Sequence, residues 1–135
     1  MDFEVNIETN GSCDIVAFRD MIKYKENLFF TIDFKLPSSG EMYKMRLSNF
    51  DSLEKRDVLK LVIGSDEDLS VAMGLACDTV AKYGDNAPHI FAGTVFGDFE
   101  LSDVIDEFMK EPALKDVQFQ IQMHKVIWDP NMRGV

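Results

Sequence analysis

The sequence is poor in the residues that build metal and redox sites. It has two cysteines, Cys13 and Cys77, and no C-x-x-C pair, which argues against a disulfide framework and the common zinc motifs. The two histidines, His89 and His124, have no further ligands at metal-binding spacing, whereas a zinc site needs three or four ligands. We therefore expect neither a metal site nor a cofactor.

Motifs for covalent catalysis and phosphate binding are also missing. No G-x-S-x-G motif occurs, because residues 11–13 and 38–40 are typical of turns. The spaced glycines of residues 93–97 are not followed by the lysine of a phosphate-binding loop. Carboxylate pairs for glycoside hydrolysis could be chosen here, but any acidic sequence offers such pairs. The sequence therefore predicts a protein that is not an enzyme and has no catalytic residues.

No long hydrophobic run is present. None approaches the ~20 residues that a membrane-spanning helix needs, and the first ten residues lack the basic start and apolar core of a signal peptide. Hydrophobic residues make up 46% and charged residues 28%, as in globular domains, and the length predicts one domain over residues 1–135. We expect no membrane contact and a cytoplasmic location.

Positive charge is scarce. Lysine and arginine number 14 against 24 acids, which gives a net charge of −10. Residues 64–111 hold eleven acids and only Lys82 and Lys110, so nearly all of the surplus lies there. Direct nucleic-acid binding is not expected, because phosphate contacts need a basic surface. A basic protein is the natural complement of such a charge, although acids can also serve only to keep a small domain soluble.

The acids that follow residue 97 are the candidate partner-binding surface. They lie just before and within the predicted second helix. There they would steer a basic partner toward the chain and fix its orientation. An ordinary solvated helix face is the competing interpretation. The residues are Asp98, Glu100, Asp103, Asp106 and Glu107.

Two segments have the apolar spacing of amphipathic helices, residues 65–83 and 101–111. The first begins with Ser65 and three acids, with Asp68 at the capping-box position, and ends at Gly84. Its apolar residues recur at i, i+3, i+4 spacing, which predicts one packing face. They are Leu69, Ala72, Met73, Ala76, Cys77 and Val80.

Alternating apolar and polar residues predict strands in the rest of the chain. This alternation is typical of an antiparallel sheet with one wet side, and the Asn-Gly pair at 10–11 favours a hairpin. Residues 52–63 are open between helix and strand, and β-branching favours a strand at 58–63. The predicted strands are residues 2–8, 13–19, 28–36, 42–47, 58–63, 89–96 and 117–128.

These elements predict an α+β domain with a mainly antiparallel sheet of six or seven strands and both helices packed on one face. For function, the sequence favours a small acidic binding protein that inhibits or neutralises a basic partner, as an immunity protein or a phage-encoded inhibitor would. A structural subunit of a larger assembly, such as a virion component, is the first alternative, and a homo-oligomer is left open. A small enzyme of unknown chemistry is the second.

Overall fold

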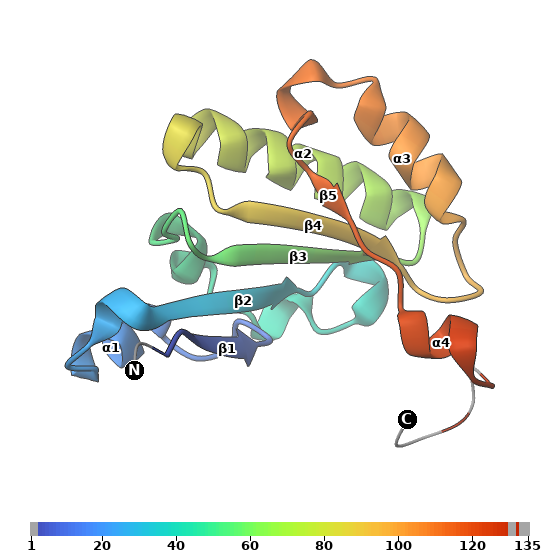
Figure 1. Ribbon diagram of the computed structural model, residues 1–135. Helices are drawn as coiled ribbons and strands as arrows, with labels where there is room; N and C mark the ends of the chain where they lie inside the picture. Colours follow the sequence, from blue (N-terminus) through green and yellow to red (C-terminus); the bar gives the residue numbers. More distant parts are fainter. Residues whose placement is uncertain (1–2, 130–131, 133–135) are drawn as a thin grey trace.

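The computed structural model describes residues 3–129 and 132, and its central feature is one sheet of five parallel strands (Figure 1). The strands lie side by side in their order along the chain, and every neighbouring pair is parallel. They are β1 (Val5–Thr9), β2 (Leu28–Phe34), β3 (Val58–Ile63), β4 (His89–Thr94) and β5 (Gln118–Phe119).

The helices that connect these strands lie on one face of the sheet. Figure 1 shows α2 (Asp66–Tyr83) and α3 (Leu101–Met109) over the upper side of the sheet as drawn. α1 (Ile15–Met21) packs against β2 on the same face, and α4 (Met123–Ile127) follows β5 beyond the strands. Short 3-10 turns complete the connections, at Lys25–Asn27, Pro37–Ser39, Met42–Lys44, Leu47–Asp51, Gly84–Asn86 and Pro112–Leu114.

The hydrophobic core lies between this helical layer and the sheet. Leu59, Leu61 and Ile63 of β3 are completely buried, and Ala72 and Ala76 of α2 lie in the same cluster. Alanine at these two positions lets α2 approach the strands closely. Each fully buried leucine or isoleucine contributes about 1.5–3 kcal/mol, so this face of the sheet carries much of the stability of the fold.

The helix predicted at residues 65–83 is present as α2. Ser65 is its N-cap, and the Ser65 hydroxyl oxygen accepts a hydrogen bond from the backbone N–H of Asp68 at 3.1 Å. Gly84 ends the helix with a φ of 54°, a positive value that favours glycine. The second predicted helix, at 101–111, is present as α3.

An ion pair fixes the amino ends of the strands to α1. The carboxylate of Asp57, just before β3, is completely buried and accepts two hydrogen bonds of 2.8 Å from the Arg19 guanidinium. It also accepts backbone N–H bonds from Phe30 and Glu54, at 2.9 and 2.8 Å. The Arg19 guanidinium lies 5.0 Å from the centre of the Phe30 ring. Asp57 therefore joins α1, β2 and the approach to β3.

The predicted antiparallel sheet is wrong, because all five described strands are parallel. The prediction followed the usual rule that a parallel sheet is covered on both faces and therefore lacks polar alternation. Here helices cover only one face, so alternate strand residues stay partly exposed, and the pattern resembles that of an antiparallel sheet. The Asn-Gly pair at 10–11 leads into a helix instead of closing a hairpin.

Three predicted strands are also corrected. Residues 13–19 fall mostly in α1, because their apolar residues fit helical spacing as well as alternation. Residues 42–47 begin as a 3-10 turn. Residues 117–128 pair with β4 only at Gln118–Phe119 and then form α4. The open segment 52–63 is resolved as a turn region followed by β3. One domain over residues 1–135 stays a prediction.

Removing the buried partner of Arg19 should strongly destabilise the fold. We expect Asp57→Asn to lower the free energy of unfolding by about 3–5 kcal/mol, because it leaves the guanidinium buried beside a neutral group. Urea unfolding followed by circular dichroism measures this. The matched control is Arg56→Met, which removes an exposed pair with Glu4 and should cost less than about 1 kcal/mol. Equal losses in both variants would contradict a structural role for the buried pair.

Candidate functional site

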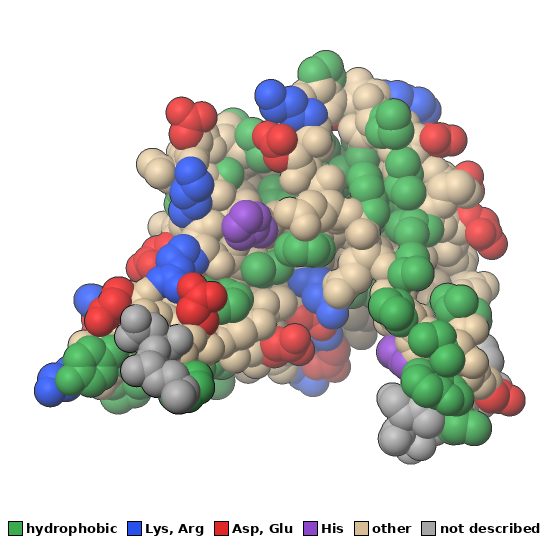
Figure 2. Space-filling view, viewed as in Figure 1, with side chains coloured by type: hydrophobic (Ala, Val, Ile, Leu, Met, Phe, Trp, Pro, Cys, Tyr) green, Lys and Arg blue, Asp and Glu red, His purple; other side chains and the backbone are tan. Residues whose placement is uncertain are grey.

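The face of the sheet opposite α2 and α3 is open. Its central strand residues are half-buried by one another. Of the described helices only α4 borders this side, where its Met123 and His124 line a hollow with Lys60 and Phe91. Figure 2 shows the molecule hollowed on this side, between the end that carries α1 and β1 and the projecting α4. Because parallel sheets are normally covered on both faces, an open face of this kind is a candidate binding surface.

Strand register places side chains of different chemical character in one row across this face. Asp33 of β2 lies opposite Lys60 of β3, Lys60 lies opposite Phe91 of β4, and Phe91 lies opposite Gln118 of β5. Neighbouring strands are ~4.8 Å apart, so a ligand that lies across the strands could contact two or three of these residues at once. The row combines an acid, a cation, an aromatic ring and an amide.

Lys60 is the residue common to the hollows of this face. Four hollows of about 240–480 Å³ open here, and Lys60 lines all of them. The neighbouring carboxylate of Asp33 is bound by Lys35, with 2.6 Å between the Lys35 Nζ and the Asp33 Oδ2. Within residues 3–129, no hydrogen bond or ion pair engages the Lys60 ammonium group. The face therefore holds a half-buried cation available to a ligand.

The largest of these hollows, about 480 Å³, lies at the carboxyl ends of the strands. Lys35, Gly64 and Val95, which follow β2, β3 and β4, line it together with Ser38 and Ser39 of the turn after β2. In parallel α/β folds ligands bind outside the carboxyl ends of the strands, since the loops there converge. Strand direction therefore supports this end of the open face as the functional one.

Asp68 fixes the wall of that hollow. Its completely buried carboxylate accepts hydrogen bonds from the Ser38 hydroxyl, the Ser38 backbone N–H at 2.9 Å and the Gly64 backbone N–H at 2.9 Å. Burial raises the pKa of the Asp68 carboxyl, but the hydrogen bonds, above all those from Ser38, outweigh burial and lower the pKa below its usual value of 3.8. An ionised Asp68 thus holds the turn after β2 against the loop after β3.

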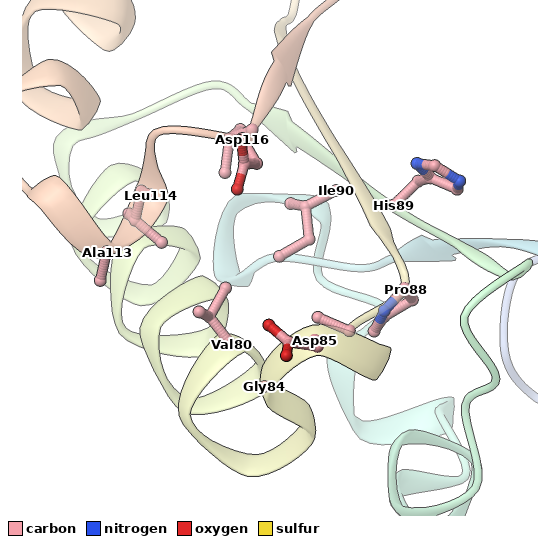
Figure 3. A pocket seen from close by; sticks show the side chains of 11 residues that line it. Val80, Gly84, Asp85, Pro88, His89, Ile90, Ala113, Leu114 and Asp116 are labelled. Atoms are coloured by element: carbon pink, nitrogen blue, oxygen red, sulfur yellow. The ribbon is translucent and has the colours of Figure 1, made fainter.

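A second type of hollow lies at the opposite end of the sheet (Figure 3). It measures about 270 Å³ and lies where Val80, Ile90 and Leu114 approach one another at the amino ends of β4 and β5. The His89 ring points away from it in Figure 3, which leaves Asp85 and Asp116 as its ionisable groups. Because the amino ends of parallel strands generally serve stability, we rank this hollow below the open face.

Four of the five predicted partner-binding acids lie away from the open face. Asp103 and Asp106 lie on the exposed side of α3, away from the sheet, and Glu107 is paired with Lys110. Glu100 is the N-cap residue of α3, although its side chain makes no capping bond. Asp98 alone lines the hollow at the carboxyl ends. The role of these five residues as a contact surface stays a prediction from the sequence.

Lys60 and Phe91 were missed by sequence reasoning. A single lysine in the run 58–63 is typical of any half-exposed strand. Only the structure shows that Asp33, its cross-strand neighbour, pairs with Lys35 instead of with Lys60. The cysteines and histidines do not assemble either: the described residues contain no group of three or more potential metal ligands. Burial, with Glu111 and Asp78 nearby, raises the pKa of the Cys77 thiol and disfavours its thiolate.

No helix within the described ranges is long and apolar enough to cross a bilayer.

Several curated proteins similar to this chain share one name, 7-carboxy-7-deazaguanine synthase. The protein of Clostridium acetobutylicum is 42% identical over 132 residues, which cover 97% of this chain and 56% of the relative. The Chlorobaculum tepidum protein is 35% identical over 108 residues, covering 77% and 46%. The Leptospira interrogans protein is 30% identical over 134 residues, covering 96% and 50%. The chain thus spans about half the length of the curated relatives it matches.

No protein-family model matches the chain, and no solved structure gives a significant match. The names of the relatives nevertheless overturn the predicted non-catalytic inhibitor, because a synthase is an enzyme. The basic protein partner and the immunity-protein and viral interpretations are wrong for the same reason. Of the alternatives drawn from the sequence, the small enzyme fits these relatives better.

The Asp68 anchor should make stability depend on acid pH. Because its pKa is lower in the folded state, Asp68 contributes fully to stability above pH 3.8, and this contribution is lost as the pH falls through the folded pKa. We expect Asp68→Asn to cost roughly 1–3 kcal/mol at neutral pH. The difference from the unmodified chain should shrink below pH 3.8 in urea unfolding series. Asp66→Asn, an exposed change in the same helical turn, is the control and should show no such convergence.

Proposed function

We propose that the chain is part of an enzyme that forms 7-carboxy-7-deazaguanine or a closely similar carboxylated deazapurine, and that the open face of the sheet binds this compound. The observation that carries the proposal is 42% identity over 97% of the chain to a protein of that name. The open face supports a binding role, because its largest hollow lies at the carboxyl ends of the strands, where parallel α/β folds bind ligands. A location in the cytoplasm stays our prediction from the sequence.

The chemistry of the open face suits such a ligand. A deazaguanine is a flat, fused bicyclic ring with hydrogen-bonding groups along its edges. Phe29 and Phe91 line one hollow of about 250 Å³ and offer aromatic surface for the ring. Asn6, Thr31 and Gln120 line the same hollow and can exchange hydrogen bonds with the edges. Apolar surface with a few polar groups is the usual composition of a small-molecule site.

A complete active site needs polypeptide beyond these 135 residues. The relatives are nearly twice as long. We propose that polypeptide beyond this chain covers the open face of the sheet. The free edge at β1 supports further protein beside this strand, because Val5 is 49% exposed on the helix-covered side. We therefore propose that this chain supplies the wall that binds the ligand, sufficient for binding by itself, and that further protein closes the site and completes the catalytic machinery.

Binding of 7-carboxy-7-deazaguanine to the chain tests the proposal. We expect saturable binding by isothermal titration calorimetry. Phe91→Ala should weaken it about five- to a hundredfold, the range reported for loss of one base–aromatic stacking contact. The control is Phe96→Ala, which removes a 48% exposed ring in the turn after β4 that lines none of the open-face hollows described above. Absence of saturable binding, or equal weakening in both variants, would reject the open face as the binding site.

A further inference from the structure

We propose that Lys60 binds the carboxylate of the ligand and thereby selects carboxylated deazapurines over the uncharged base. This inference rests on the proposed function and names the specificity-determining residue of the same site. Its first support is position, since Lys60 lies in the middle strand of the five and lines every hollow described on the open face. A ligand in any of these hollows would lie beside its side chain.

The second support is the state of the Lys60 charge. The acids that share its hollows are Glu8, Asp33 and Asp98. Asp33 is engaged by Lys35, and no carboxylate of residues 3–129 lies within ion-pair distance of the Lys60 Nζ. Partial burial of a charge without a partner is unfavourable, so a ligand carboxylate would relieve that cost as well as gain a charge-assisted hydrogen bond.

The third support is the pairing with Phe91. Lys60 and Phe91 are direct cross-strand neighbours, and both point to the open face, where they line two hollows together. A deazapurine stacked on Phe91 would therefore extend its edge toward the ammonium group one strand away. The carboxyl group at position 7 projects from the edge of the five-membered ring, which lets stacking and ion pairing occur together.

A solvated surface lysine outside the candidate site should not affect the preference for the carboxylated ligand. Lys115 is exposed and lies in the loop before β5, outside the hollows of the open face. Replacing Lys115 removes the same charge from the chain without touching the candidate site. The pair Lys60→Met and Lys115→Met therefore separates local recognition from the effect of net charge, which is −11 in both variants because each removes one positive charge from −10.

The test compares two ligands, 7-carboxy-7-deazaguanine and 7-deazaguanine, by isothermal titration calorimetry at low salt. We expect the unmodified chain to prefer the carboxylated compound by about tenfold to a hundredfold, as for a hydrogen bond to a charged group. Lys60→Met should lose this preference and bind 7-deazaguanine within about twofold of the unmodified chain. Lys60→Arg should keep part of the preference, and Lys115→Met all of it.

The results distinguish a failure of the role of Lys60 from a failure of the proposed function. Equal preference in Lys60→Met and the unmodified chain would overturn the role of Lys60 and leave the proposed function intact. Absence of binding of either compound to the unmodified chain would reject the proposed function and this inference together. Circular dichroism checks the fold of each variant, and Lys60→Gln replaces Lys60→Met if the latter does not fold. Loss of affinity for both compounds in a folded Lys60→Met would show general packing instead of carboxylate selection.

Discussion

The parallel direction of the five strands is the constraint on which the rest of the structure depends. Each strand can follow its neighbour only after the chain has crossed back over a face of the sheet, and these crossovers share one handedness in nearly all proteins. Because the strands also lie in chain order, the connecting helices gather on one face. The opposite face is left open, and the loops after the strands converge at one end of it. Site geometry thus follows from strand direction.

The two ends of the sheet carry different buried carboxylates. Asp57 at the amino ends neutralises the buried Arg19 and accepts backbone N–H groups, which makes it a structural anchor. Asp68 at the carboxyl ends instead binds the Ser38 turn, which lines the candidate site. An interior charge is tolerated in both places because hydrogen bonds replace its water shell. One buried carboxylate therefore anchors the fold at the amino ends of the strands, and the other fixes the wall of the candidate site at the carboxyl ends.

The sequence predicts local elements of this fold better than their arrangement. Ser65 and the apolar spacing that follows it define α2, and alternation defines the core strands 28–34, 58–63 and 89–94. Whether neighbouring strands are parallel depends on the path of the chain between them, which no local pattern encodes. The alternation of apolar and polar residues led to the wrong prediction of an antiparallel sheet. An open face on a parallel sheet gives the same sequence pattern as the solvent-exposed face of an antiparallel one. The position of Lys60 in the candidate site was missed for a similar reason, since Phe91 and the other residues that line its hollows come from other strands.

Net charge was a poor guide to the binding surface of this chain, because it does not show where each charge lies. Of the acids that made residues 64–111 the candidate surface, Asp68 is buried as a loop anchor and Glu107 is bound to Lys110. The local potential in a hollow depends mainly on the nearest charges and on the low dielectric around them. An acidic chain can therefore bind an anionic ligand where one cation stands without a neutralising partner. Lys60 meets that condition, so the acidity of the molecule is compatible with recognition of a carboxylate.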